Sequence, residues 1–372
     1  MDSTIQKVSE GNQQTTCPVN SYNSWDPLEE VIVGRVEGAT IPPAHPVVTF
    51  DIPRQSARWL RIFGGLRYPK WIIDRAKKQL DEFVHILESE GVTVRRPDVI
   101  NFATRYKTPY WSSTGHCIAC PRDGFIVVGN EIIETPMAWR ARFFESYAYR
   151  SLFKEYFAKG ARWTSAPKPE LLDELYDYKY SIPEKGEPMR YVINEFEPVF
   201  DAADFIRCGK DIFVQRSNVT NEAGITWMRR HLGDQYQIHV IETECRTPMH
   251  IDSTFMPLAP GKLLVNPDYI DINKLPKMFK SWDIIVAPPP DPIPNPLSKY
   301  IAMVSSWISL NMLMLDEKRV IVEKCQPSMI KTLEEHGFEP IPCYFYHYLS
   351  VGGSFHCATL DIRRRGTLQS YF

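Results

Sequence analysis

Short runs of apolar and β-branched residues recur along the chain, and each run stops at a turn former or a polar residue. They occupy residues 30–35, 125–130, 211–216, 263–267 and 319–323. This composition and length predict buried β-strands. Each run is followed by a segment whose apolar residues have helical spacing, at residues 70–90, 136–157, 221–232, 272–282 and 327–336. These segments predict amphipathic helices.

A second β-prone run follows most of these helices, at residues 92–95, 237–241, 284–287 and 338–344. The repeating unit is therefore strand, helix, strand, and it occurs five times. Five such units predict an α/β fold, specifically a five-bladed α/β propeller closed by a last strand at 357–362 beside the first. Closure would remove exposed sheet edges. The spacing of the units is uneven, so a doubly wound α/β sheet is the alternative.

The domain organisation is simple. Residues 1–16 are polar and predict a disordered tail, and residues 17–372 are expected to form a single domain. Two segments, 37–69 and 164–188, read as insertions over the body of the fold. The proline-rich stretch 288–296 reads as a stiff surface connection.

Composition narrows the functional class. With 44% hydrophobic residues, 24% charged residues and a net charge of −2, the chain has the balance of a globular protein and no basic field for nucleic acid or anionic membranes. It contains no run of about 18 apolar residues. It also shows no secretory or organelle-targeting pattern, so a cytoplasmic location is expected. The eight cysteines are then expected to be mostly free thiols.

A candidate nucleophile lies near the end of the chain. Gly352 and Gly353 permit a sharp turn, and Cys357 follows where that turn becomes a strand. This position could hold a thiol rigidly at the mouth of a site. The alternative is a buried structural cysteine.

Other polar residues lie just ahead of the repeated strands. They are Asp123, Asp201, His250 and Asp252, and equivalent units would bring them to one end of the fold with Cys357. If His250 and Asp252 lie in a strand they share a face, so Asp252 is expected to orient the imidazole. His356 would then point away from Cys357 and is given a structural role. The alternative for His250 and Asp252 is a pair of surface polar residues.

Buried carboxylates need cationic partners, and several around one point suit a planar guanidinium. The alternative is salt bridges to nearby arginines such as Arg122, Arg207 and Arg216. Cys117 and Cys120 form a CxxC without a second metal-binding pair, so no metal site is predicted and a redox role is weakly supported. The three consecutive arginines at residues 363–365 are interpreted as a solvated edge of the fold. No glycine-rich phosphate loop is present in the sequence.

Six stretches together resemble the arginine:glycine and arginine:inosamine-phosphate amidinotransferases: residues 25–35, 200–205, 248–252, 314–319, 355–357 and 363–370. The likeness runs from about Cys17 to the end of the chain. It implies the five-bladed pentein propeller. It also implies that Cys357 is the nucleophile and His250 the acid/base, and that Met249 and Ser305 contact substrate. The family's carboxylates map to Asp123, Asp201 and Asp252.

Three positions depart from the glycine enzymes. Tyr269 replaces an arginine that grips the substrate carboxylate, Ala358 replaces a tryptophan after the nucleophile, and Thr247 replaces an asparagine. All three are included among the candidate substrate-binding residues. Among relatives, the chain looks like the cyanobacterial toxin-pathway branch, including the saxitoxin one.

The resemblance implies amidino transfer from L-arginine to a primary amine through an amidino-cysteine, without metal or cofactor. The acceptor is expected to be larger than glycine and to lack a carboxylate. Alternatives are a glycine amidinotransferase, a guanidine hydrolase that uses water as acceptor, and a non-enzymatic binding module on a pentein-like body. The expected partners are small-molecule substrates, with no nucleic acid or membrane. A homodimer is the one protein assembly considered, although the sequence does not fix the oligomeric state.

Overall fold

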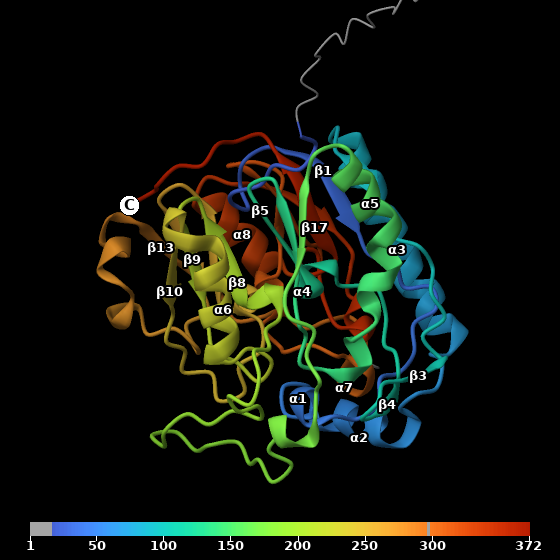
Figure 1. Cartoon of the computed structure of the whole chain (residues 1–372). Helices are drawn as coiled ribbons and strands as arrows, with labels where there is room; N and C mark the ends of the chain where they lie inside the picture. The colour runs from blue at the N-terminus through green and yellow to red at the C-terminus, as the bar shows by residue number, and fades with distance from the viewer. Residues whose placement is uncertain (1–16, 296–297) are drawn as a thin grey trace, which may run out of the picture.

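A computed structural model describes residues 17–295 and 298–372. The predicted tail at 1–16 lies outside the described residues. Among those described, the strands form five three-stranded sheets and one two-stranded sheet, and helices lie around them in a mixed α/β fold (Figure 1). In this part of the chain, no helix has the length and apolar character needed to cross a membrane.

The five three-stranded sheets share one topology, in which an antiparallel pair is extended by a parallel third strand. The first sheet contains β17 (Thr359–Arg364), β1 (Leu28–Val33) and β2 (Thr93–Arg95). The others are β5 (Phe125–Val128), β6 (Glu131–Glu134) and β7 (Arg162–Ser165); β8 (Phe205–Cys208), β9 (Asp211–Val214) and β10 (Gln237–Val240); β11 (Phe255–Ala259), β12 (Lys262–Val265) and β13 (Asp283–Val286); and β14 (Leu313–Met314), β15 (Arg319–Glu323) and β16 (Glu339–Cys343). The two-stranded sheet pairs β3 (Arg105–Lys107) with β4 (Ser112–Thr114).

The predicted pairing of the last strand with the first is confirmed. β17 runs antiparallel to β1, with Val31 opposite Asp361 and Val33 opposite Thr359. No strand pairing joins one three-stranded sheet to the next within the described residues, so the sheets do not form a continuous barrel.

Each three-stranded sheet with its connecting segment is called a module from here on. The sequence pattern missed one strand in most modules. β8, β11 and β14 were not expected, and 125–130 was taken for the strand that β6 provides. β5, β8 and β11 are all buried along their whole length; of these three, only β5 was predicted, within 125–130. A left-handed glycine turns the chain after each of these three: Gly129, Gly209 and Gly261.

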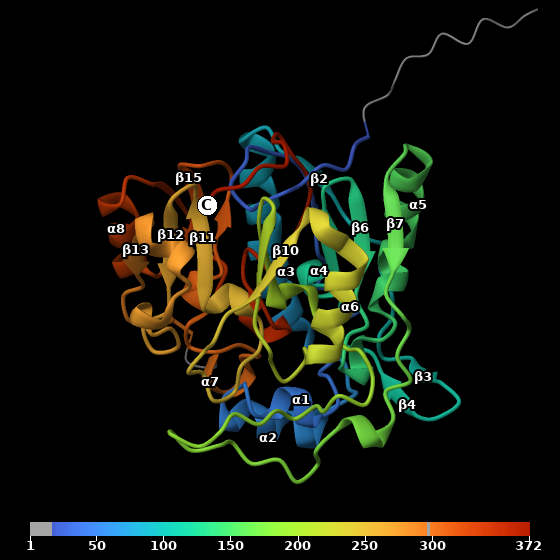
Figure 2. The same cartoon turned by 60° about the vertical axis from the view of Figure 1, so that its left-hand side comes forward.

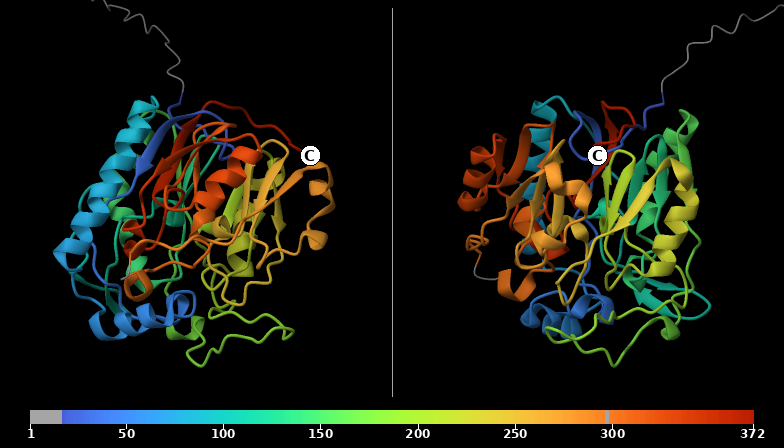
Figure 3. Two further views of the ribbon diagram at one scale, coloured as in Figure 1. Left: turned by 180° about the vertical axis from the view of Figure 1, so that it is seen from behind. Right: turned by 90° about the vertical axis from the view of Figure 1, so that its left-hand side faces the viewer.

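The connecting helices follow the prediction in three modules. They are α3 (Lys70–Ser89), α6 (Glu222–Leu232) and α8 (Pro327–Glu335), and Figure 3 shows α3 on the outside of the molecule. The helix expected at 136–157 is instead two 3₁₀ turns, η1 (Arg140–Arg142) and η2 (Glu145–Tyr149), followed by α5 (Arg150–Ala158). The helix expected at 272–282 is two 3₁₀ turns, η7 (Ile272–Lys274) and η8 (Lys277–Ser281), separated by Pro276. Proline has no amide hydrogen to continue a helix.

The two predicted insertions lie at one end of the molecule (Figure 2). Residues 37–69 contain α1 (Pro46–Thr49) and α2 (Arg54–Phe63), and residues 164–188 contain η3 (Asp173–Leu175). Aromatic contacts join them: His45 packs on Tyr176 at 4.6 Å and Phe50 on Tyr180 at 4.9 Å between ring centroids. The remaining short helical elements are α4 (Pro121–Gly124), α7 (Ser298–Ile301), η4 (Ala202–Asp204), η5 (Gly233–Gln235), η6 (Ile251–Ser253), η9 (Ile308–Leu310) and η10 (Tyr348–Val351).

A fully buried ion cluster lies where several modules meet. The carboxylate of Asp361 accepts hydrogen bonds from Arg122 at 2.6 Å, Arg207 at 3.1 Å and Arg364 at 2.8 Å. Burial opposes the charge on Asp361, but the three guanidinium groups hold its pKa well below the usual range. The reading of 363–365 as a solvated edge is therefore wrong for Arg364, which has no exposed surface.

Candidate active site

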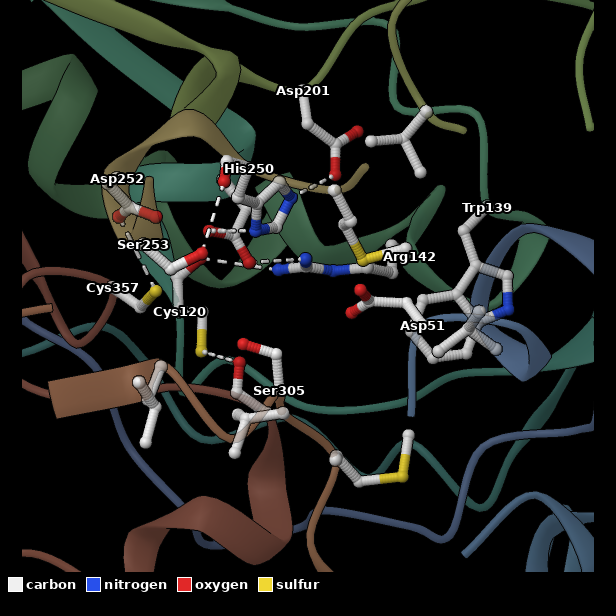
Figure 4. A pocket seen from close by; sticks show the side chains of 18 of the residues that line it. Asp51, Cys120, Trp139, Arg142, Asp201, His250, Asp252, Ser253, Ser305 and Cys357 are labelled. Atoms are coloured by element: carbon white, nitrogen blue, oxygen red, sulfur yellow. Dashed lines mark hydrogen bonds and ion pairs between the residues drawn. The ribbon is translucent and has the colours of Figure 1, made fainter. Parts of the chain in front are cut away.

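The site is built from equivalent positions in four modules. Asp123 lies in α4 before β5, Asp201 is the N-cap of η4 before β8, and Asp252 lies in η6 before β11. Cys357 occupies the turn before β17. α4 contacts η4, and η4 contacts η6, so these short turns meet at the centre of the fold. With His250, the four side chains line one cavity (Figure 4).

The turn that carries the thiol depends on its two glycines. Gly352 has a φ of 96°, which is the left-handed region that favours glycine. A Cβ on Gly353 would lie 2.6 Å from Cys357 Cβ and 2.8 Å from Cys120 Sγ. Both glycines are therefore needed for the chain to bring Cys357 to the cavity wall.

Cys357 is buried at the cavity wall. Its backbone N–H donates to Asn311 Oδ1 at 3.0 Å, and its Sγ donates to Asp252 Oδ2 at 3.7 Å. Burial and the charges of Asp252 and Asp123 raise the thiol pKa to about 12, against an opposing effect of His250. A cation bound between these carboxylates would lower that pKa and favour the thiolate.

His250 is positioned by Asp201 and not by Asp252. His250 Nε2 donates to Asp201 Oδ2 at 3.0 Å, and Nδ1 lies 3.7 Å from Asp123 Oδ1. Burial alone would lower the imidazole pKa, but the carboxylates of Asp123 and Asp201 raise it well above its ordinary value. A protonated His250 can act as an acid toward a group in the cavity.

The expectation that Asp252 orients His250 is therefore wrong. Asp252 accepts a 2.7 Å hydrogen bond from His356 Nδ1 and also faces the Cys357 thiol. The physical reason is local: His250 has a φ of 59° and precedes a 3₁₀ turn, so residues two apart do not share a face as they would in a strand. His356 is buried, as its structural assignment requires, and it fixes Asp252 beside the thiol.

Two carboxylate oxygens in the cavity lack hydrogen-bond partners among the described residues, Asp123 Oδ1 and Asp201 Oδ1. The other oxygen of Asp123 accepts from Arg142 Nη1 at 2.6 Å. The arginines named as alternative partners lie elsewhere, since Arg122 and Arg207 pair with Asp361 and Arg216 pairs with Glu195. Orphaned buried acceptors indicate that a ligand with N–H donors completes the site.

Metal binding has some geometric support but weak chemical support. Asp123, His250 and Cys357 offer ligand atoms within 4.8 Å of one another. However, the raised pKa of His250 favours its protonated form, which cannot ligate a metal.

The two thiols of the CxxC sequence contact the turn before Cys357. Cys117 Sγ donates to the Val351 carbonyl, and Cys120 Sγ donates to the Gly352 carbonyl.

The remaining sequence candidates divide into two groups. Met249 and Ser305 line the cavity, whereas Thr247, Tyr269 and Ala358 are not among its lining residues. Ala358 is fully buried, and its N–H donates to the Ser354 carbonyl at 2.8 Å.

Several lining residues were not predicted from sequence, notably Asp51, Trp139 and Arg142. Arg142 lay in a segment interpreted as one regular helix. Asp51 lay in an insertion, although a single acid within the apolar run 47–52 is an informative signal.

Comparisons with known proteins define the class of the molecule. No protein-family model matches the chain. It is 54% identical over 356 residues to the L-arginine:L-lysine amidinotransferase of Pseudomonas savastanoi pv. phaseolicola, covering 96% of this chain and 97% of that protein. It is 50% identical over 362 residues to the mitochondrial glycine amidinotransferase of Danio rerio, covering 96% and 85%.

A solved structure agrees with these relatives. SxtG, an amidinotransferase from Microseira wollei in the saxitoxin biosynthetic pathway, superposes with a TM-score of 0.92 at 58% identity, covering 96% of this chain and all of that one. Fold and sequence together define a transferase enzyme with a mixed α/β fold. The chain belongs to the amidinotransferase family.

Proposed function

We propose that this protein transfers the amidino group of L-arginine to a primary amine through an amidino-cysteine at Cys357 and releases ornithine. The observation that carries the proposal is the arrangement of one thiol, one imidazole and three carboxylates around a single cavity, with two carboxylate oxygens unpartnered. A guanidinium offers the planar set of N–H donors that such acceptors require.

The geometry supports a role for each residue. The guanidinium of arginine binds against the unpartnered Oδ1 atoms of Asp123 and Asp201 and beside Asp252, and its charge favours the Cys357 thiolate. The sulfur attacks the guanidinium carbon, the bond from that carbon to the ornithine nitrogen breaks, and His250 gives its proton to the departing amine. Asp201 holds His250 in place for this transfer. The acceptor amine then loses a proton to His250 and attacks the amidino carbon, the carbon–sulfur bond breaks, and Cys357 leaves as the thiolate.

The fold is proposed to be a five-bladed propeller formed by residues 17–372 as one catalytic unit. The five sheets of equal topology and the β1–β17 pair support it, as does the placement of site residues at equivalent turns. In such an arrangement no single module contains the site, so activity requires the whole unit.

The acceptor is proposed to be a primary amine larger than glycine and without a carboxylate, in toxin or secondary-metabolite biosynthesis. The likeness to SxtG supports this choice. Glycine is the competing acceptor, supported by the Danio rerio relative, and lysine is the acceptor in the name of the Pseudomonas relative. A screen of amines at fixed arginine, with products identified by mass, distinguishes them.

The covalent step is tested without an acceptor. Arginine alone should add one amidino group to Cys357, because the first half-reaction needs no amine. Intact-protein and peptide mass spectrometry would locate it, and Cys357→Ala should lose both the adduct and ornithine release. Ornithine release that persists in Cys357→Ala would show that the nucleophile is another residue. Citrulline formed from arginine without an amine would instead indicate a hydrolase.

A further inference from the structure

The cavity has a wall contributed by the two insertions. Asp51 follows α1 within residues 37–69, and Figure 4 shows its side chain across the cavity from Cys357. Its neighbour Phe50 packs on Tyr180 of the second insertion. The Tyr180 hydroxyl donates to the Arg246 carbonyl at 3.4 Å, four residues before His250. Asp51 is therefore carried by a segment that is fixed to the rest of the site.

The carboxylate of Asp51 differs from the other three in this cavity. Asp123 is paired with Arg142, Asp201 with His250, and Asp252 with His356. Asp51 makes no side-chain hydrogen bond or ion pair with any described residue. Asp51 is half-buried at the cavity wall, so its carboxylate is within reach of a ligand that supplies the opposite charge.

The protein groups around Asp51 do not supply that charge at close range. Tyr269 and Cys245 lie near enough for the Asp51 charge to raise their pKa values, in addition to the effect of their own burial. Both are neutral at physiological pH. Burial raises the pKa of Asp51 to about 7, opposed by His250 and reinforced by Asp204. The carboxylate therefore lies in an environment that an approaching cation would stabilise.

We infer that Asp51 is a specificity-determining residue that binds an ammonium group of the substrates at the end of the cavity remote from Cys357. This inference rests on the proposed amidino transfer. Arginine presents a guanidinium at one end and an α-ammonium at the other, which matches carboxylates on opposite walls. Because donor and acceptor occupy the cavity in turn, Asp51 also favours acceptors that carry a second ammonium, such as a diamine.

The test compares two donors that differ only in that group. 5-Guanidinopentanoate retains the guanidinium, chain and carboxylate of arginine but has no α-ammonium. The rate of amidino-Cys357 formation is measured for both donors by quenching and intact mass. In Asp51→Asn, kcat/KM for arginine labelling should fall at least about tenfold, in keeping with loss of a charge-assisted contact. The value for 5-guanidinopentanoate should stay within about threefold of the unmodified enzyme.

Asp177→Asn is the matched control, because it makes the same charge change at an exposed position of the other insertion. It should leave the ratio between the two donors unaltered. Thermal unfolding of Asp51→Asn should occur at the same or higher temperature, since the substitution removes an unpartnered acid. Tyr269→Arg gives an independent variant: a cation beside Asp51 should also reduce the preference for arginine.

The outcomes separate the inference from the function on which it rests. If the unmodified enzyme forms no adduct with arginine, the proposed amidino transfer fails. If it forms the adduct but Asp51→Asn slows both donors equally, Asp51 does not bind the ammonium. Cadaverine and pentylamine make the same comparison for the acceptor, and equal loss of both amines in Asp51→Asn would overturn the acceptor part.

Discussion

The substitution Asp201→Asn tests the catalytic geometry most directly. It removes the negative charge that lies 3.0 Å from His250 Nε2 and keeps a side chain of the same shape. Both partners are largely buried, with 13% and 4% of their side-chain surface exposed, so solvent screens the contact weakly. Loss of the charge should lower the pKa of His250, because the carboxylate stabilises the imidazolium form.

The size of the effect follows from the contact. A hydrogen bond to a charged group contributes about 1.5–3 kcal/mol. The imidazolium form loses about that stabilisation in Asp201→Asn, so the His250 pKa should fall. His250 must be protonated to donate to the leaving amine. The rate of amidino-cysteine formation therefore declines as pH rises through the His250 pKa, and this alkaline limb should move to lower pH in Asp201→Asn.

The assay is a pH–rate profile of amidino-Cys357 formation from saturating arginine in single turnover. Asp252→Asn is the matched control, because Asp252 faces the thiol and His356. Its rate should fall at all pH values, while the alkaline limb stays in place. An alkaline limb that moves in Asp252→Asn and not in Asp201→Asn would refute the assignment of Asp201 as the partner of His250.

Three further predictions follow from the same site. His250→Asn should slow both half-reactions by about 10²–10⁴-fold, measured as adduct formation and then as acceptor-dependent adduct decay; near-normal rates would assign the proton transfer to another group. A longer primary amine without a carboxylate should exceed glycine as acceptor by at least about tenfold in kcat/KM, equivalent to about 1.4 kcal/mol. Glycine equal to every such amine would contradict this. Gly353→Ala should destabilise the protein by about 1–3 kcal/mol in denaturant unfolding and slow adduct formation, because its Cβ would overlap Cys357; unchanged stability and rate would show that the turn adjusts freely.

The sequence pattern predicted the repeated modules because their outer strands and helices have one buried and one exposed side. α3 illustrates this: Ile72, Ala76 and Leu80 recur every four residues and all are buried. The inner strands β8 and β11 were missed because each contains a residue that is atypical of a buried strand: Arg207, which pairs with Asp361, and Pro257.

The sequence predicted which residues form the candidate site better than it predicted which of their side chains contact one another. Cys357, His250 and the three aspartates do line one cavity, because they precede the inner strands of four modules. Their partners depend on distances between modules that no local pattern contains. Asp252 and His250 are two residues apart in sequence, yet Asp252 binds His356, 104 positions away.

The cluster around Asp361 has a consequence for how the protein is made. Arg122 and Arg207 are buried and pair with an acid that lies 239 and 154 positions further along the chain. During synthesis from the N-terminus, both arginines would leave the ribosome long before their counter-ion. Removing one partner of a buried ion pair costs about 3–5 kcal/mol, so the centre becomes stable only after Asp361 has been synthesised. A chain truncated before Asp361 should therefore remain sensitive to protease throughout, including the segments that hold Arg122 and Arg207 in place.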